Sequence, residues 1–421
     1  MRKMVFVALA IGFVGSYGSP SEARSLAGQL SSFVTQNVIF PGVHNVDTIT
    51  PVFLRLASQA TDFPVPPTTP GYVFTYNPTE GVFERSTGSL GPVFLERVET
   101  VGENHAAIGV SYLYGNVDKF DGSNFAQGFN TRVGIVATDP STGRNFEGGT
   151  TIDKLELPTN RFNFAATYGV TDNLDVGLLL PLVVTKLTVA GRGYVGPSIG
   201  GQPNPTTEAA AVFGPSMGFS DTSTGIGDLL VRAKYRFGYL ADFGFAGGFT
   251  LRCPTGDEND FHGLGDWTVA PLLIISRTFG LNDFHANMGM EFNAGNSQAS
   301  RALYGIGATL QAEQFPWVAF LLDFLGASYL DNQTFNQTVR VNPQIQTAGF
   351  VAPFLTSQQA NPNGSFTLTS TIPRADQFNV AVGLKFAIWG NALGYVNALV
   401  PLTRQGLQAD VISAGGVEYS F

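Results

Sequence analysis

The sequence has little of what usually holds a protein of 421 residues together or gives it a charged surface. Cys253 is its only cysteine, so no internal disulfide can form. Charged residues make up 13% of the chain, whereas soluble globular proteins carry about a quarter. The formal net charge is −9, and Lys and Arg are nowhere concentrated, which argues against non-specific binding to nucleic acid.

Long hydrophobic runs are also missing beyond the N-terminus. No apolar stretch of about 18 residues follows residue 23, so we expect no second membrane helix. At the N-terminus, a basic start at residues 2–3 precedes a short apolar core over residues 4–14, with small residues after it. This pattern predicts a signal peptide over residues 1–23, cleaved after Ala23.

Patterns of catalytic and metal-binding residues are absent too. The four histidines have no metal-ligand spacing, and the sequence contains neither H-E-x-x-H nor C-x-x-C nor Gly-x-Ser-x-Gly. His285 shares a predicted strand face with Asn287, as in some outer-membrane lipases, but no serine nucleophile lies beside it. The acidic run 257–260 could offer oxygen ligands to calcium, although its spacing differs from that of an EF-hand. We therefore expect no enzyme, no cofactor and no metal site.

What the sequence does contain is Gly, Phe and Tyr, 50, 35 and 13 residues respectively, arranged with a period of two. In 174–184 every second residue is Leu or Val, while Asp175 and Gly177 lie between them. The segments 225–237, 243–253 and 377–386 alternate in the same way. Successive side chains of a strand point to opposite faces, so these segments predict two-faced strands.

Three features favour a membrane barrel over a soluble sandwich. The segments are roughly 10 to 16 residues long, longer than the five or six typical of soluble strands and long enough to span as barrel strands. Short connections alternate with long polar ones at 121–151, 191–223, 255–265 and 331–373, as in outer-membrane barrels. The chain also ends in an alternating strand that finishes with Phe421, which resembles the assembly signal of these barrels.

We therefore predict an all-β fold, a transmembrane antiparallel up-and-down β-barrel in the bacterial outer membrane. Its strands are expected at 106–120, 152–169, 174–190, 224–237, 243–254, 266–278, 284–295, 301–312, 317–330, 374–386, 392–401 and 412–421. Twelve is an even number, which would place both barrel ends on the periplasmic side. Fourteen strands remain possible if 72–76 and 82–98 also enter the barrel.

Residues 24–104 do not look like barrel strands. Residues 25–38 predict a short amphipathic helix, and 60–70 are rich in Pro and Thr. This segment could plug the lumen or hang in the periplasm. We favour a plug, because an apolar segment needs a surface to pack against, and we assign the barrel to 105–421.

Three stretches, 94–97 (FLER), 168–177 (YGVTDNLDVG) and 225–237 (GIGDLLVRAKYRF), resemble a known family of outer-membrane barrels. It is the "MetA-pathway of phenol degradation" family, often described as transporters and distantly similar to channels for fatty acids and aromatic hydrocarbons. The resemblance covers most of 72–421 and is weak in the loops. It implies that 24–104 forms a plug and that the cargo is hydrophobic, and it carries no catalytic residues.

The strand phases also predict which charged side chains line the pore. These are Arg161, Asp175, Asp228, Arg232, Lys234, Arg236, Arg252, Glu291, Asp323, Lys385 and Glu418. A charge on the lipid face costs about 2–4 kcal/mol at mid-depth, which forces them inward. They could form a polar lumen, hold the plug, or fill a narrow barrel as a ladder of salt bridges.

The leading hypothesis is a channel for passive uptake of small hydrophobic or aromatic compounds. It expects a substrate pocket under the external loops, lined by Phe213, Met217, Phe219, Phe350 and Phe354. The alternatives are a general or anion-biased porin and a structural or adhesive barrel. The expected partners are outer-membrane lipids and lipopolysaccharide, a small hydrophobic solute, and the barrel-assembly machinery through Tyr419 and Phe421, with no nucleic acid.

Overall fold

The computed structural model describes residues 25–36, 50–68, 71–72, 74–77, 82–85, 89–124, 131–138, 145–197, 212–340, 347–351 and 354–421. The predicted signal peptide, 1–23, lies outside these residues. The two α-helices are α1 (Leu26–Gln36) and α2 (Thr50–Ala60), and short 3-10 helices follow at η2 (Glu258–Asp260) and η3 (Ser297–Ala299). Neither these nor any other described helix has the length and apolar content that crossing a bilayer requires.

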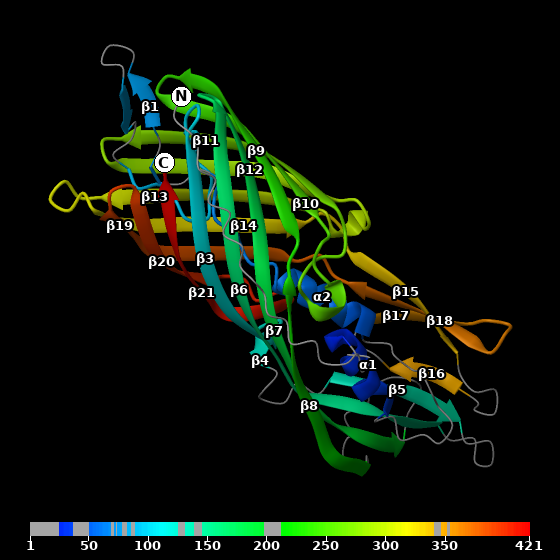
Figure 1. Ribbon diagram of the computed structural model, residues 1–421. Helices are drawn as coiled ribbons and strands as arrows, with labels where there is room; N and C mark the ends of the chain where they lie inside the picture. The colour runs from blue at the N-terminus through cyan, green and yellow to red at the C-terminus, as the bar shows by residue number, and fades with distance from the viewer. Residues whose placement is uncertain are drawn as a thin grey trace, which may run out of the picture.

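Twelve antiparallel strands close into a ring (Figure 1). In order around the ring they are β3 (Ala106–Phe120), β6 (Asn145–Thr171), β7 (Leu174–Pro197), β9 (Leu229–Leu240), β10 (Phe243–Cys253), β11 (Thr268–Phe279), β12 (Asn282–Asn293), β13 (Arg301–Gln311), β14 (Val318–Tyr329), β19 (Asp376–Trp389), β20 (Ala392–Pro401) and β21 (Leu407–Ser420). The last strand, β21, pairs with the first, β3, and so closes the barrel. The predicted twelve-stranded barrel is confirmed.

The remaining strands lie outside this ring. In the part of the chain that the structure describes, β1 (Phe74–Asn77) and β2 (Val82–Arg85) pair with each other alone, so they do not extend the barrel to fourteen strands. On the other side, β4 (Ser123–Asn124), β5 (Thr131–Thr138), β16 (Thr347–Val351) and β8 (Val212–Ile226) continue the barrel sheet. A separate sheet consists of β15 (Gln333–Arg340), β17 (Leu355–Ala360) and β18 (Ser365–Ile372).

Much of what the sequence predicted as long loops is strand. The expected loop 191–223 contains the end of β7 and most of β8, and the expected loop 331–373 contains β15 to β18. The reason is that strands beyond the bilayer need no apolar outer face. In β18, Ser and Thr alternate with Phe, Leu and Ile. Because only one face of this strand is buried, the segment is polar enough to resemble a loop in the sequence.

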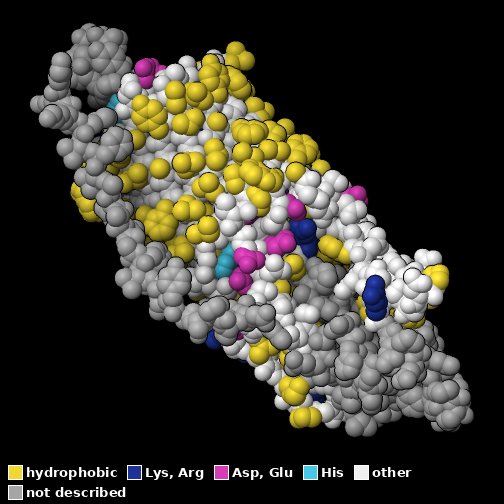
Figure 2. All heavy atoms as spheres, turned by 45° about the vertical axis from the view of Figure 1, so that its right-hand side comes forward, with side chains coloured by type: hydrophobic (Ala, Val, Ile, Leu, Met, Phe, Trp, Pro, Cys, Tyr) yellow, Lys and Arg dark blue, Asp and Glu magenta, His cyan; other side chains and the backbone are white. Residues whose placement is uncertain are grey.

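The membrane-facing surface follows the predicted period of two. Val176, Leu178 and Leu180 of β7 are exposed on the outside, while Leu179 between them is buried inside. Figure 2 shows apolar side chains spread over the outer face of the barrel, with charged side chains gathered beyond one edge of that band. A continuous apolar band on the outer face is the surface that a lipid bilayer requires.

One barrel strand is interrupted. β8 pairs with Leu182–Val195 of β7, and β9 pairs with Leu174–Leu179 of the same strand. The two strands therefore lie end to end along one edge of β7. Gly227 and Asp228 separate them. A side chain at Gly227 would press against Pro181 and the carbonyl of His262, which explains why glycine occupies the break.

The two helices pack inside the barrel, toward the end away from the short turns (Figure 1). α1 buries Leu26, Leu30, Phe33 and Val34, a spacing that puts all four on one helical face. The ring of Phe33 lies 5.9 Å from that of Phe219 on β8. α2 contributes Phe53, Leu56 and Ala57 to the same cluster of buried apolar side chains. The short turns lie at the end where the chain terminates, which is the periplasmic end by the rule for such barrels.

After α2 the chain continues through the inside of the barrel. We call residues 62–101 the interior segment. Its described part has no strand apart from β1 and β2, so its buried main chain needs hydrogen-bond partners from elsewhere. Inward side chains of the barrel strands supply many of them.

Candidate functional site

The inward charged side chains of the barrel bind the main chain of the interior segment. Lys234 Nζ donates to the carbonyls of Arg97 and Glu99, at 3.1 and 2.6 Å. Arg232 Nη1 donates to the carbonyl of Pro66 at 2.6 Å, and both carboxylate oxygens of Asp175 accept from Val101 N at 3.1 Å. These side chains were predicted to line the pore, and each of them lies inside the barrel and holds the segment.

The opposite side of the barrel binds the segment in the same way. Lys385 Nζ donates to the carbonyl of Pro92 at 3.2 Å and pairs with Glu418 at 2.8 Å. Glu418 in turn accepts from Gly71 N at 2.6 Å. The guanidinium of Arg97 is buried against Gly91 and donates to the carbonyl of Gly71 at 2.6 Å, so the segment also binds itself.

Several charged side chains inside the barrel converge on Asp62, the second residue after α2. Its carboxylate receives a two-fold hydrogen bond from Arg252, at 2.9 and 3.1 Å, and one from Arg301 at 2.8 Å. Arg161 Nη1 lies 3.7 Å away. Burial raises the pKa of Asp62, but the three arginines outweigh burial and hold this pKa below its usual value. Asp62 is therefore a carboxylate anion.

Two further carboxylates hold the arginines in place. Glu291 accepts from Arg301 Nε at 2.8 Å and lies 3.9 Å from Arg252. Asp228 lies 3.8 Å from Arg252 and accepts main-chain N–H bonds from Gly256 and Leu264 of the loop after β10. We call Arg161, Arg252 and Arg301 the arginine cluster.

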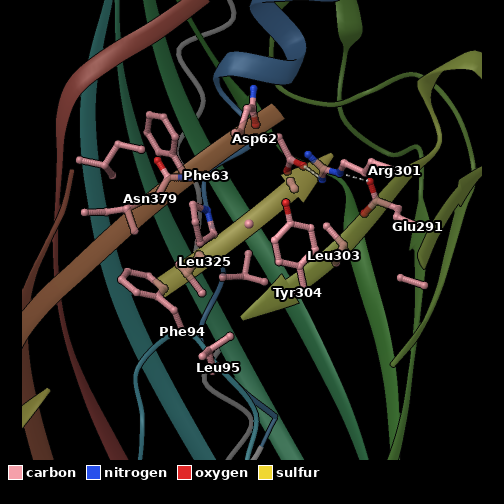
Figure 3. A pocket seen from close by; sticks show the side chains of 18 of the residues that line it. Asp62, Phe63, Phe94, Leu95, Glu291, Arg301, Leu303, Tyr304, Leu325 and Asn379 are labelled. Atoms are coloured by element: carbon pink, nitrogen blue, oxygen red, sulfur yellow. Dashed lines mark hydrogen bonds and ion pairs between the residues drawn. The ribbon is translucent and has the colours of Figure 1, made fainter. Parts of the chain in front are cut away.

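A cavity of about 310 Å³ adjoins this cluster. Asp62, Arg252, Arg301 and Glu291 line one part of it, and the apolar side chains lie elsewhere around it (Figure 3). The apolar lining includes Phe63, Phe94, Leu95, Leu303, Leu325 and Ile412. The cavity can thus hold a mainly apolar small molecule that carries one polar group.

Two smaller cavities adjoin this central one. An outer cavity of about 200 Å³ shares Gln59, Ala60, Gln377 and Leu407 with it and is lined further out by Phe120, Asp121 and Arg374. An inner cavity of about 40 Å³ shares Pro66 and Pro67 with it and follows β3, β6 and β21. The three cavities form a series in which the innermost is much the narrowest.

The comparison with protein families agrees with this architecture. The family described as "Putative MetA-pathway of phenol degradation" matches residues 137–388. The chain belongs to this family. Its fold and its family identify it as a bacterial outer-membrane β-barrel of the channel type, not an enzyme. No curated protein matches the sequence.

Solved structures similar to this family member are outer-membrane proteins. An outer membrane channel from Pseudomonas putida F1 is 12% identical, with a TM-score of 0.43, over 77% of this chain and 98% of that one. A FadL homologue from Pseudomonas aeruginosa is 10% identical, with a TM-score of 0.28, over 76% of this chain and 89% of that one.

In this family member the predicted aromatic pocket does not assemble. Phe213 and Met217 are exposed by 38% and 44%, and Phe219 packs against α1. Phe350 is buried against Phe366, at a ring distance of 5.1 Å. Phe354 borders the outer cavity, where its ring lies 5.4 Å from that of Phe120. The predicted pocket lay under two loops, 191–223 and 331–373, whereas the strands there leave Phe213 and Met217 exposed and pack Phe219 and Phe350 against Phe33 and Phe366.

Other predicted residues have local roles. Arg236 lies at a short turn and donates to Asn173 Oδ1 at 3.0 Å and the carbonyl of Asp172 at 2.9 Å. Asp323 forms a buried pair with His285, with Nε2 and Oδ1 3.0 Å apart. No group of His, Cys, Asp or Glu in the described residues could hold a metal ion. In the acidic run, Asp257 caps η2 and Asp260 accepts from Leu26 N of α1.

Two of the central residues were not predicted from the sequence. Asp62 is a single acidic residue in a Pro-rich stretch. Arg301 is the first residue of its strand, where the alternation of residues does not yet show which face the side chain belongs to. A signal for Asp62 was nonetheless present. It lies among residues that predict no strand, in a chain whose inward arginines need counter-charges.

Proposed function

We propose that the protein is a channel for the passive uptake of small hydrophobic or aromatic compounds across the outer membrane. The central cavity carries this proposal, because its lining is mostly apolar and it lies within the barrel. Binding sites for small molecules generally combine such an apolar lining with a few fixed polar groups. Membership of a family named for phenol degradation supports the same class of solute.

The series of cavities supports a route for the solute. A compound would enter the outer cavity beside Phe120 and Phe354, pass Gln59 and Ala60 at the end of α2, and reach the central cavity. Further passage needs movement of the interior segment near Pro66 and Pro67, because the inner cavity has room for only a few water molecules. In this proposal residues 24–104 act as a plug.

The occupied lumen argues against a general porin. The inward charges that would attract ions bind the interior segment instead, as Lys234 and Lys385 do. A water-filled pore would leave such side chains facing solvent. We therefore expect little conductance for ions or sugars from the full-length protein.

Uptake of radiolabelled 4-phenylbutyrate, a small aromatic probe, tests the proposal in cells that lack their own major porins. Ala327→Trp fills the central cavity from β14, whereas Ala308→Trp places the same indole on the lipid face of β13, between the exposed Ile306 and Leu310. We expect wild type and Ala308→Trp to raise uptake equally and Ala327→Trp to abolish the increase. Equal uptake by all three, or free passage of arabinose in proteoliposomes, would contradict the proposal.

A further inference from the structure

We propose that Asp62 occupies a receptor for the carboxylate of the transported solute, and that exchange of the two carboxylates releases the interior segment. This inference rests on the proposed function and names its solute class: small amphipathic monocarboxylates with an aromatic or aliphatic body. A carboxylate of the interior segment, that of Asp62, fills a site built by side chains of three barrel strands.

The receptor belongs to the barrel. Arg161, Arg252 and Arg301 come from three different strands, β6, β10 and β13, and all three guanidinium groups point at one carboxylate. The side chains of Arg161 and Arg252 are buried and that of Arg301 is 12% exposed, and Glu291 and Asp228 keep two of the three oriented. Arginine presents a planar set of donors that matches a carboxylate, so the site is preorganised for that group.

The charges of the site require an anion there. Three arginines face three carboxylates, Asp62, Asp228 and Glu291, which gives +3 and −3. If Asp62 leaves, the remaining charge is +3 − 2 = +1. A buried uncompensated charge is costly, so the segment can leave readily only if another monoanion takes its place.

The cavity beside the site fits the rest of such a molecule. Asp62, Arg252 and Arg301 all border the central cavity, and apolar residues line other parts of it (Figure 3). Two donors at the site also have spare capacity: within the described residues, Nε of Arg161 and Nε of Arg252 are buried without a hydrogen-bond partner. A solute carboxylate at the arginines would thus place its body against Phe63, Phe94 or Leu325.

Asp62 is well placed to transmit the exchange. It directly follows Thr61 at the end of α2, and the next residue, Phe63, gives its carbonyl to Arg161 at 3.3 Å. The other polar contacts of α2 include Arg55 with Asp266 and Gln59 with Gln333. Loss of the Asp62 contact would therefore weaken the hold of the barrel on the link between α2 and Pro66, leaving main-chain contacts such as those of Phe63 and Pro66. A ligand shifts this equilibrium only by its preference for the released state.

The first test is calorimetric binding to the full-length protein in non-ionic detergent, with 4-phenylbutyrate and its neutral amide as probes. Asp62→Asn removes the internal competitor, and Asp153→Asn is the matched control, because it removes a carboxylate paired with Arg192 in the outer part of the wall. We expect Asp62→Asn to lower the Kd of the acid by roughly tenfold or more, the ratio expected for one charge-assisted hydrogen bond. The Kd of the amide should not change, and the control should match wild type.

The second test keeps Asp62 and so does not depend on the folding of that variant. Val65→Cys in a Cys253→Ser background places a single thiol on the interior segment at the central cavity. We expect 4-phenylbutyrate to raise the rate of maleimide labelling severalfold and the amide to leave it unchanged. Equal effects of acid and amide in both tests would overturn the exchange and leave the uptake proposal intact. If neither probe binds, both proposals fail.

Discussion

Asn287 on β12 acts as a strand partner for the main chain of Glu96. Its Oδ1 accepts from Glu96 N at 2.7 Å and its Nδ2 donates to Glu96 O at 2.9 Å. One amide side chain thus satisfies both main-chain groups of a residue that has no strand neighbour. Elsewhere inside this barrel, inward polar side chains likewise supply main-chain hydrogen bonds that a neighbouring strand would otherwise provide.

Asn287→Ala should loosen the interior segment without disrupting the barrel. Two main-chain groups of Glu96 would lose their partners, and each buried unsatisfied group costs about 1–3 kcal/mol. Hydrogen–deuterium exchange should therefore show the Glu96 amide losing protection by at least roughly tenfold. Asn397→Ala is the control, because in the described structure the amide of this buried residue bonds to nothing. Equal protection in both variants would contradict the role given to Asn287.

Gly307→Ala should destabilise the barrel by about 1–3 kcal/mol, the usual cost of overpacking. A Cβ at this position would overlap both Asp323 Oδ1 and His285 Nε2, the two atoms of the buried pair. The temperature at which the refolded protein loses its heat-modifiable gel mobility should fall. Gly109→Ala is the control, since its Cβ would come no nearer than 3.6 Å to any atom outside the adjacent residues. A normal transition temperature for Gly307→Ala would mean that the pair can shift at little cost.

The barrel could be predicted because lipid imposes a pattern on the sequence. Every second residue of a spanning strand must be apolar, so the outward Phe243, Phe245 and Phe249 reveal β10 without reference to any partner. The same reasoning placed Arg232, Lys234 and Lys385 inside, since charge on the other face would be expensive. The ends of the strands were harder to predict, because the alternation of apolar residues is lost where a strand extends beyond the bilayer, as in β8.

The site could not be predicted because its contacts join distant parts of the chain. Asp62 meets Arg252 and Arg301 across 190 and 239 residues, and no local spacing records that meeting. The predicted aromatic pocket failed for a related reason. Phe residues in a polar stretch indicate burial somewhere, but only the strand pairing decides that Phe350 faces Phe366 and that Phe219 faces α1.

Acid should open the loop between β10 and β11 through His262. Burial lowers the pKa of this imidazole, although Asp260 and Asp257 oppose that change. The pKa of this histidine is lower in the folded state than its ordinary value of 6.5. Its contribution to the stability of the fold is therefore complete above pH 6.5. That contribution declines as pH falls below 6.5 toward the lowered pKa. The protection factor of the Leu264 amide, which donates to Asp228, should therefore decrease between pH 7 and 5, and His262→Gln should remove most of this pH dependence. A pH profile identical in the variant would contradict the assignment.

Loss of the Phe421 side chain should impair assembly but not the stability of the finished barrel. The main chain of Phe421 closes the barrel, with reciprocal 2.8 Å hydrogen bonds to Ala106, and Phe421→Ala keeps both. The ring itself is 57% exposed and contacts Tyr419, so it contributes little to the folded core. We therefore expect Phe421→Ala to lower the amount of folded protein in the outer membrane severalfold, while protein refolded in detergent melts like wild type. Phe249→Ala, which removes a comparably exposed ring from β10, should assemble normally. If Phe421→Ala also assembled normally, the terminal aromatic residue would have no part in recognition by the assembly machinery.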